Sequence, residues 1–97
     1  MKPAYSTLTS KIKGYTGRTM VYSLYVLSLE ENDGQWLIKM AMTQSKSGKY
    51  SNIVYVTTTE EPNFSVDSQQ RMYGKCLGML EVDGKDYPAF ELLFWDN

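Results

Sequence analysis

Apolar and polar residues alternate along most of this sequence in short runs, the pattern of β-strands that bury one face. The run from residue 35 to 43 shows the alternation best. One of its faces carries only large apolar side chains, those of Trp36, Ile38, Met40 and Met42. The other face is mixed and includes Lys39. We expect the first face to line a core and Lys39 to lie outside it.

Turn residues separate the runs, so the pattern predicts five strands. The predicted strands are residues 19–29, 35–43, 51–58, 71–82 and 86–95. Asp33-Gly34 and Asp83-Gly84 predict hairpin turns, because both residues of an Asp-Gly pair tolerate positive φ. Interior glycines at positions 74 and 78 predict bulges or sharp bends in the fourth strand.

The segment from Glu60 to Gln70 interrupts the strand pattern, with Pro62 near its start. It predicts an irregular loop or a short helix near residues 62–70. A chain of 97 residues has no room for two cores, so we expect one domain over residues 1–97. The predicted fold is all-β, a small barrel of five to six strands.

Three strands, a helix or loop, and then a two-stranded hairpin is the strand order of the oligonucleotide/oligosaccharide-binding (OB) fold. The glycine-containing run Arg71–Leu77 is similar to the fourth strand of such barrels, and the hairpin loop that contains Lys46 and Lys49 is basic. Residues 18 to 95 therefore resemble small OB-fold proteins that bind single-stranded DNA. The resemblance implies that the sheet surface binds single-stranded nucleic acid.

Composition excludes several kinds of chemistry. The chain has no histidine and one cysteine. It can form neither a histidine-based catalytic triad nor a Cys/His metal site, and no disulfide within the chain. The adjacent acids Glu30-Glu31 and Glu60-Glu61 lie beside predicted turns, where carboxylates are solvated. We expect a non-catalytic protein that uses no metal and no cofactor.

Charge is segregated along the chain although the net charge is −1. Residues 1–59 hold seven Lys or Arg and three acids, a net charge of +4, whereas residues 60–97 have a net charge of −5. Polyanion binding depends on such local positive charge. The loop before Tyr50 contains Lys46 and Lys49, which predicts phosphate contacts with Tyr50 stacking on a base. The alternative is an ordinary solvated loop.

Tyrosine is abundant, with eight residues in the chain. Alternation allows several tyrosines to share the outer face of Lys39, where stacking is worth about 1–3 kcal/mol per base. Alternatively, tyrosine rings are buried at barrel ends with their hydroxyls in water. The residues expected to bind nucleic acid are Tyr25, Lys39, Lys46, Lys49, Tyr50, Tyr55, Tyr73 and Lys75.

Two functions remain open at this point. The first is non-catalytic binding of single-stranded DNA or RNA. The second is a protein–protein interaction module, such as a phage-encoded inhibitor or assembly factor. In that module tyrosines form the hot spot and the acidic half contacts a basic partner. The last strand is apolar on both faces, so Phe90, Phe94 and Trp95 are predicted to be core or a homo-oligomer contact.

No stretch of the chain has the apolar length of a signal peptide or a membrane helix, so no membrane association is expected. A lone thiol is typical of a reducing compartment. We therefore expect a cytoplasmic protein, in the host cytoplasm if a phage, virus or mobile element such as a plasmid encodes it.

Overall fold

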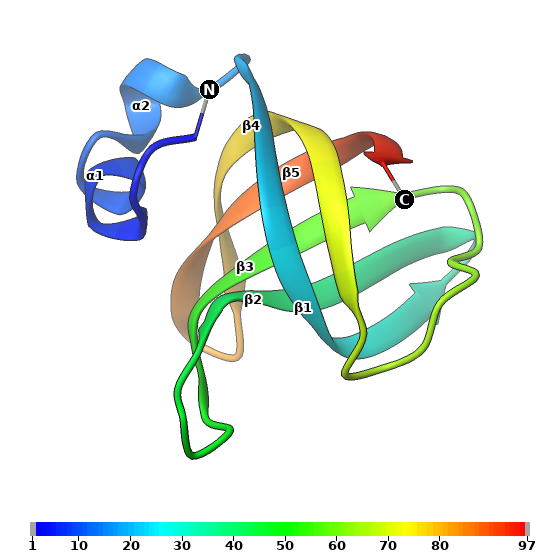
Figure 1. The fold of residues 1–97 in the computed structure, drawn as a ribbon. Coiled ribbons are helices and arrows are strands. Elements are labelled where there is room, and N and C mark those ends of the chain that lie inside the picture. Colours follow the sequence, from blue (N-terminus) through cyan, green and yellow to red (C-terminus); the bar gives the residue numbers. More distant parts are fainter. Residues whose placement is uncertain (1, 97) are drawn as a thin grey trace.

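The computed structural model describes residues 2–96. They form two short helices followed by the five strands of a closed barrel. The elements are α1 (Tyr5–Ser10), α2 (Ile12–Tyr15), β1 (Thr19–Asn32), β2 (Gln35–Gln44), β3 (Tyr50–Thr58), β4 (Gln69–Val82) and β5 (Lys85–Asp96). The strand order around the barrel is β1-β2-β3-β5-β4 (Figure 1). β3 and β5 are parallel and every other pair is antiparallel. The predicted all-β, OB-fold-like small barrel is confirmed.

Local turn chemistry explains where the strands end. Asp33 and Gly34 have φ values of 54° and 82°, and Asp83 and Gly84 have 52° and 82°, as a tight hairpin turn requires. The pairing of β4 with β5 shifts register between Tyr73 and Gly74 and between Cys76 and Gly78. The two interior glycines thus mark the irregularities that the sequence predicts. All five expected strands are present, each extended by a few residues at most.

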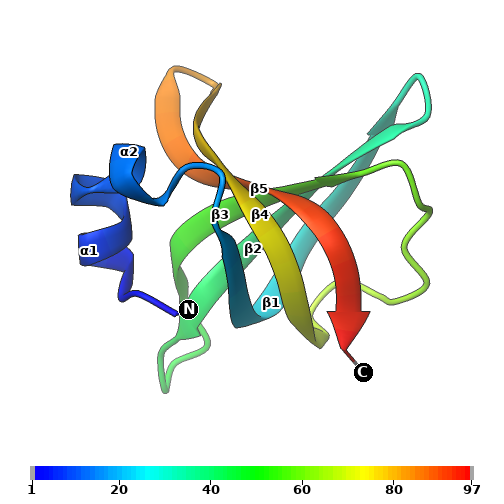
Figure 2. The ribbon, with the colours of Figure 1, turned by 90° about the horizontal axis from the view of Figure 1, so that it is seen from above.

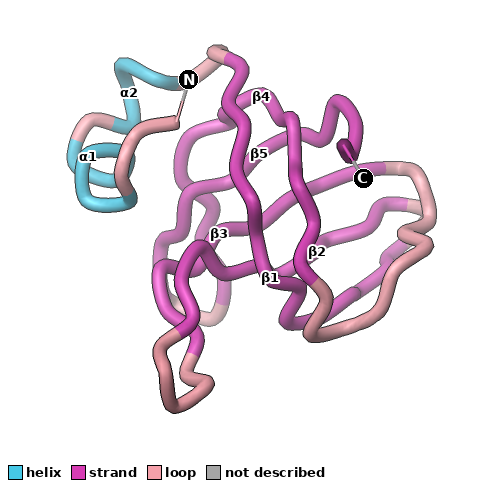
Figure 3. The backbone as a smooth tube through the Cα atoms, in the orientation of Figure 1, coloured by secondary structure: helices cyan, strands magenta, loops and turns pink. Residues whose placement is uncertain are grey.

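The helical residues lie at the start of the chain, not near residues 62–70. Residues 59–68 form a loop between β3 and β4, so the helical alternative for that segment is wrong (Figure 3). Helices α1 and α2 were not expected, although the sequence carries a signal for them. Tyr5, Leu8, Ile12 and Tyr15 follow helical spacing among polar residues, and all four pack on the core.

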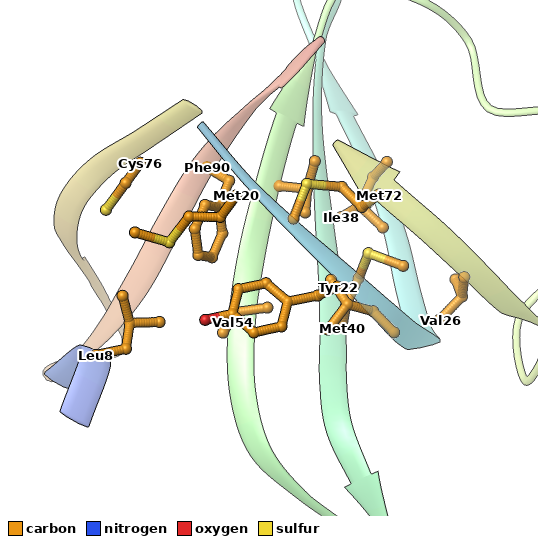
Figure 4. Packing of buried hydrophobic residues seen from close by; sticks show 12 residues of the cluster. Leu8, Met20, Tyr22, Val26, Ile38, Met40, Val54, Met72, Cys76 and Phe90 are labelled. Atoms are coloured by element: carbon orange, nitrogen blue, oxygen red, sulfur yellow. The ribbon is translucent and has the colours of Figure 1, made fainter. Parts of the chain in front are cut away.

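The core fills the barrel and one of its ends. Leu8 of α1 is 0% exposed and belongs to the same buried cluster as the barrel residues Val54, Cys76 and Phe90 (Figure 4). Of the predicted core face of β2, Ile38 and Met40 are fully buried, whereas Trp36 and Met42 are partly exposed.

The Tyr22 side chain links the barrel core to the N-terminal segment. Its hydroxyl donates a hydrogen bond of 2.6 Å to the Pro3 carbonyl. Its ring meets Phe90 edge-on, with 5.8 Å between centroids. Burial, together with Cys76 and Tyr15, raises the pKa of Tyr22 to about 12. The N-terminal segment is therefore held to the barrel by polar as well as apolar contacts.

Candidate nucleic-acid interface

The loop between β2 and β3 carries the predicted phosphate contacts. Residues 45–49 project away from the barrel (Figure 1). The Ser45 amide donates to the Lys49 carbonyl at 2.8 Å, and the Gly48 amide donates to the Ser45 carbonyl at 2.9 Å. Gly48 has a φ of 87°, which this tight turn needs. The loop is closed by its own hydrogen bonds, and both Lys46 and Lys49 are exposed on it.

Two of the predicted tyrosines meet at the base of this loop. The rings of Tyr25 on β1 and Tyr50 on β3 are 5.5 Å apart between centroids, tilted by 46°. The Tyr50 hydroxyl donates to Asp67 Oδ1 at 3.2 Å, and desolvation together with this bond raises the pKa of Tyr50. Both rings are half-buried. We call Tyr25, Lys46, Lys49 and Tyr50 the loop surface.

Lys39 and Tyr55 are cross-strand partners on the outer face of β2 and β3. Lys39 is half-buried, but Tyr55 is only 6% exposed. Tyr87 of the β4–β5 hairpin packs against the Tyr55 ring, with 5.3 Å between centroids. Burial, with smaller effects of Tyr87, Asp83 and Glu30, raises the pKa of Tyr55. Tyr55 therefore faces outward, as alternation predicts, but its ring is covered, contrary to the expectation of an open stacking surface.

Tyr73 and Lys75 lie on a different part of the barrel. They belong to β4. In the closed barrel β1 lies between β4 and β2, and β5 lies between β4 and β3. Tyr73 stacks on Phe94 of β5, with centroids 4.4 Å apart and planes 15° apart. Lys75 is exposed opposite Glu91. The expectation that Tyr25, Lys39, Tyr55, Tyr73 and Lys75 share one face is wrong, because a closed barrel distributes them around its circumference.

A cleft lies between the tips of the β1–β2 and β4–β5 hairpins, which project on the same side of the barrel (Figure 2). Its volume is about 490 Å³, and its lining includes Leu37, Thr57, Leu80, Glu30 and Glu31. The two tips together carry one lysine, Lys85, and six acids, namely Glu30, Glu31, Asp33, Glu81, Asp83 and Asp86. In OB folds this face and these two loops bind oligonucleotides. Here the acids at the two tips repel phosphate, so the part of this face beside the tips is unsuited to a polyanion.

Comparison with protein-family models, curated proteins and solved structures gives no match for this chain. Within residues 2–96, no helix has the length and apolar character needed to cross a membrane. The same residues contain no group of three or more His, Cys, Asp or Glu side chains placed to hold a metal ion.

Proposed function

We propose that this protein binds single-stranded nucleic acid, without catalysis, on the loop surface. The observation that supports this proposal is the position of Lys46 and Lys49 next to the Tyr25–Tyr50 pair. This surface lies on the side of the barrel away from the acidic hairpin tips (Figure 2). Asp67, the acid nearest to the pair, is engaged by the Tyr50 hydroxyl.

Each part of the loop surface has a separate task in this proposal. The two lysines neutralise phosphates and release counterions, which supplies sequence-independent affinity. The tyrosine rings stack on bases, and every base offers a π face. Ala41 of β2 is the cross-strand partner of Tyr25. Lys39 lies two residues before Ala41, on the same face of β2. Two residues span about 7 Å along a strand. We therefore assign to Lys39 the phosphate that follows the base stacked on Tyr25.

The test is a titration with a fluorescent oligo-dT at two salt concentrations. The wild type should bind at about 50 mM salt and weaken steeply by about 200 mM. The double variant Lys46→Glu/Lys49→Glu should lose at least roughly tenfold in affinity, and its log–log salt slope should be smaller by about two. Intrinsic tyrosine and tryptophan emission should be quenched on binding by the wild type.

The matched control is Lys11→Glu/Lys13→Glu, which makes the same charge change on exposed residues of the N-terminal helical segment. Its affinity should stay within about threefold of the wild type, because long-range effects between exposed charges are screened. Equal losses of affinity in both double variants would show that the loop surface contributes only general electrostatic attraction and is not a defined binding site. A wild type that binds no single strand at the lower salt concentration would refute the proposed function.

The acidic cleft supports a second candidate function, capture of a basic segment of another protein. Its lining combines Leu37 and Leu80 with the carboxylates of Glu30 and Glu31. This pairing suits a peptide that alternates lysine and leucine. Glu30→Gln should weaken binding of such a fluorescent peptide severalfold, because it removes one rim charge. Glu31 is left intact, since its Oε2 accepts the Gly34 amide at 2.7 Å in the turn.

The control for the cleft is Glu60→Gln, which removes an acid from a solvated pair in the β3–β4 loop. It should leave the affinity for the peptide unchanged. No binding by the wild type, or the same loss in both variants, would remove this second candidate.

A further inference from the structure

Exposed apolar side chains are concentrated on β4 and β5. Among residues 2–96, the exposed large hydrophobic residues are Val66, Leu77, Met79, Leu93 and Phe94. All except Val66 lie on these two strands. Phe94 is 52% exposed although its ring stacks on Tyr73. On a small protein, an exposed apolar patch marks an interaction site.

A bulge in β5 exposes two of these residues, Leu93 and Phe94. Tyr73 pairs with Phe94 while Gly74 pairs with Leu92, so Leu93 is an extra residue in β5. Leu92 and Trp95 pack on the core, and Leu93 and Phe94 are both exposed between them. A bulge re-aims side chains in this way, and bulges are frequent at barrel rims and next to functional sites. We call Tyr73, Leu93 and Phe94 the β4–β5 patch.

A charged cross-strand pair lies at each end of the patch. At one end Arg71 of β4 is opposite Asp96 of β5, with 3.7 Å between Nε and Oδ2. At the other end Lys75 of β4 is opposite Glu91 of β5. In both pairs the cation belongs to β4 and the anion to β5. Within these two pairs one strand is positive and the other negative. Glu60 and Glu61, which line a shallow cleft with Phe94 and Trp95, add negative charge beside β5.

This polarity matches a second copy of the same chain in one orientation. A two-fold axis that lies between β4 and β5, parallel to them, places each β4 over the other copy's β5. Arg71 then faces the partner's Asp96, and Lys75 faces the partner's Glu91. Tyr73 lies over the partner's Phe94.

Another orientation of the axis fails on charge. An axis across the strands places Arg71 against the partner's Lys75 and Asp96 against the partner's Glu91. Both contacts then join like charges, which costs free energy in a contact region. A polyanion or a polycation would likewise meet one strand of the wrong sign.

We propose that this protein forms a symmetric dimer through the β4–β5 patch, with the two-fold axis parallel to the two strands. The aromatic pair and Leu93 supply the apolar centre of the interface. The charged pairs at the two ends set the register and the orientation of the copies. The loop surface belongs to β1 and the β2–β3 hairpin, so this proposal does not depend on nucleic-acid binding.

The experiment uses two charge variants, Lys75→Glu and Glu91→Lys, followed by sedimentation velocity. The wild type should be a dimer at high micromolar concentration. Each variant alone should be monomeric, because its own dimer would hold two like-charge contacts. An equimolar mixture of the two variants should form a heterodimer, since each contact between residue 75 of one copy and residue 91 of the other then joins opposite charges.

A second pair of variants tests the apolar centre. Phe94→Ser should weaken the dimer by more than roughly tenfold, as loss of a central aromatic contact does. Val66→Ser changes a residue that is 47% exposed in the β3–β4 loop and should leave the dimer unchanged. A monomeric wild type at high concentration would overturn the proposal. The proposal would also be overturned if the wild type is a dimer but the mixture of the two charge variants stays monomeric. That result would contradict a two-fold axis parallel to β4 and β5.

Discussion

Replacing Phe90 with alanine is expected to lower the free energy of unfolding by about 3–5 kcal/mol. Phe90 is fully buried at the point where β5 pairs with both β3 and β4, opposite Val56 and Cys76. Its removal would leave a cavity beside the Tyr22 ring. A domain of this size is stable by only about 5–15 kcal/mol in total, so the loss is a large share.

The control for this prediction is Phe94→Ala, on the same strand. Phe94 is exposed and stacks on the Tyr73 ring, so its loss should cost about 1 kcal/mol. Urea unfolding followed by tryptophan emission measures both variants at low protein concentration, where a dimer contributes little. Equal losses in the two variants would contradict the placement of these phenylalanines on opposite sides of β5.

Replacing Leu8 with alanine is expected to lower the free energy of unfolding by about 2–5 kcal/mol. Leu8 is the one buried residue of α1, and it joins the barrel core. Helix α1 has six residues and no side-chain cap, so packing rather than intrinsic propensity holds it. Loss of Leu8 should therefore also release the N-terminal segment from the barrel end.

Urea unfolding measures the stability loss, and limited trypsin digestion measures the release. Cleavage after Lys11 and Lys13 should be faster in Leu8→Ala than in the wild type, because local opening exposes the backbone. Ser6→Ala changes an exposed residue of the same helix and should stay within about 0.5 kcal/mol of the wild type. Unchanged stability and cleavage in Leu8→Ala would show that the helix does not close the barrel end.

The strands could be predicted because their causes are local. Side-chain alternation along residues 35–43 identifies the buried face of β2, and Asp33-Gly34 permits the turn that precedes it. Gly74 could be assigned to a register irregularity for a similar reason. A Cβ at that position would meet Met72, Phe90 and the Glu91 carbonyl, so only glycine fits there without displacement.

The N-terminal helices could have been found from the spacing of Tyr5, Leu8, Ile12 and Tyr15. That spacing is the helical period, but it extends over only three turns in a segment rich in serine and threonine. Helices this short are marginal alone. Their formation depends on the contact of Leu8 with the barrel end. Local helix propensity does not include that tertiary contact.

The candidate site could be predicted only in part. Lys46, Lys49 and Tyr50 are neighbours in sequence, so their grouping needs no tertiary information. Tyr25 reaches Tyr50 only because β2 pairs with β1 on one side and with β3 on the other. The burial of Tyr55 follows from Tyr87, which is 32 positions away and reaches it through the β4–β5 hairpin.

Alternation, turn residues and charge counts are properties of adjacent positions, and they were enough to specify five strands, their turns and a basic loop. Which outward side chains share a surface depends on closure of the barrel, because closure places β4 beside β1 and β5 beside β3. That step separated Tyr73 and Lys75 from Lys39 and brought the acidic hairpin tips to either side of the cleft. It also left Phe94 exposed over Tyr73, in a patch whose charges fit a second copy of the chain.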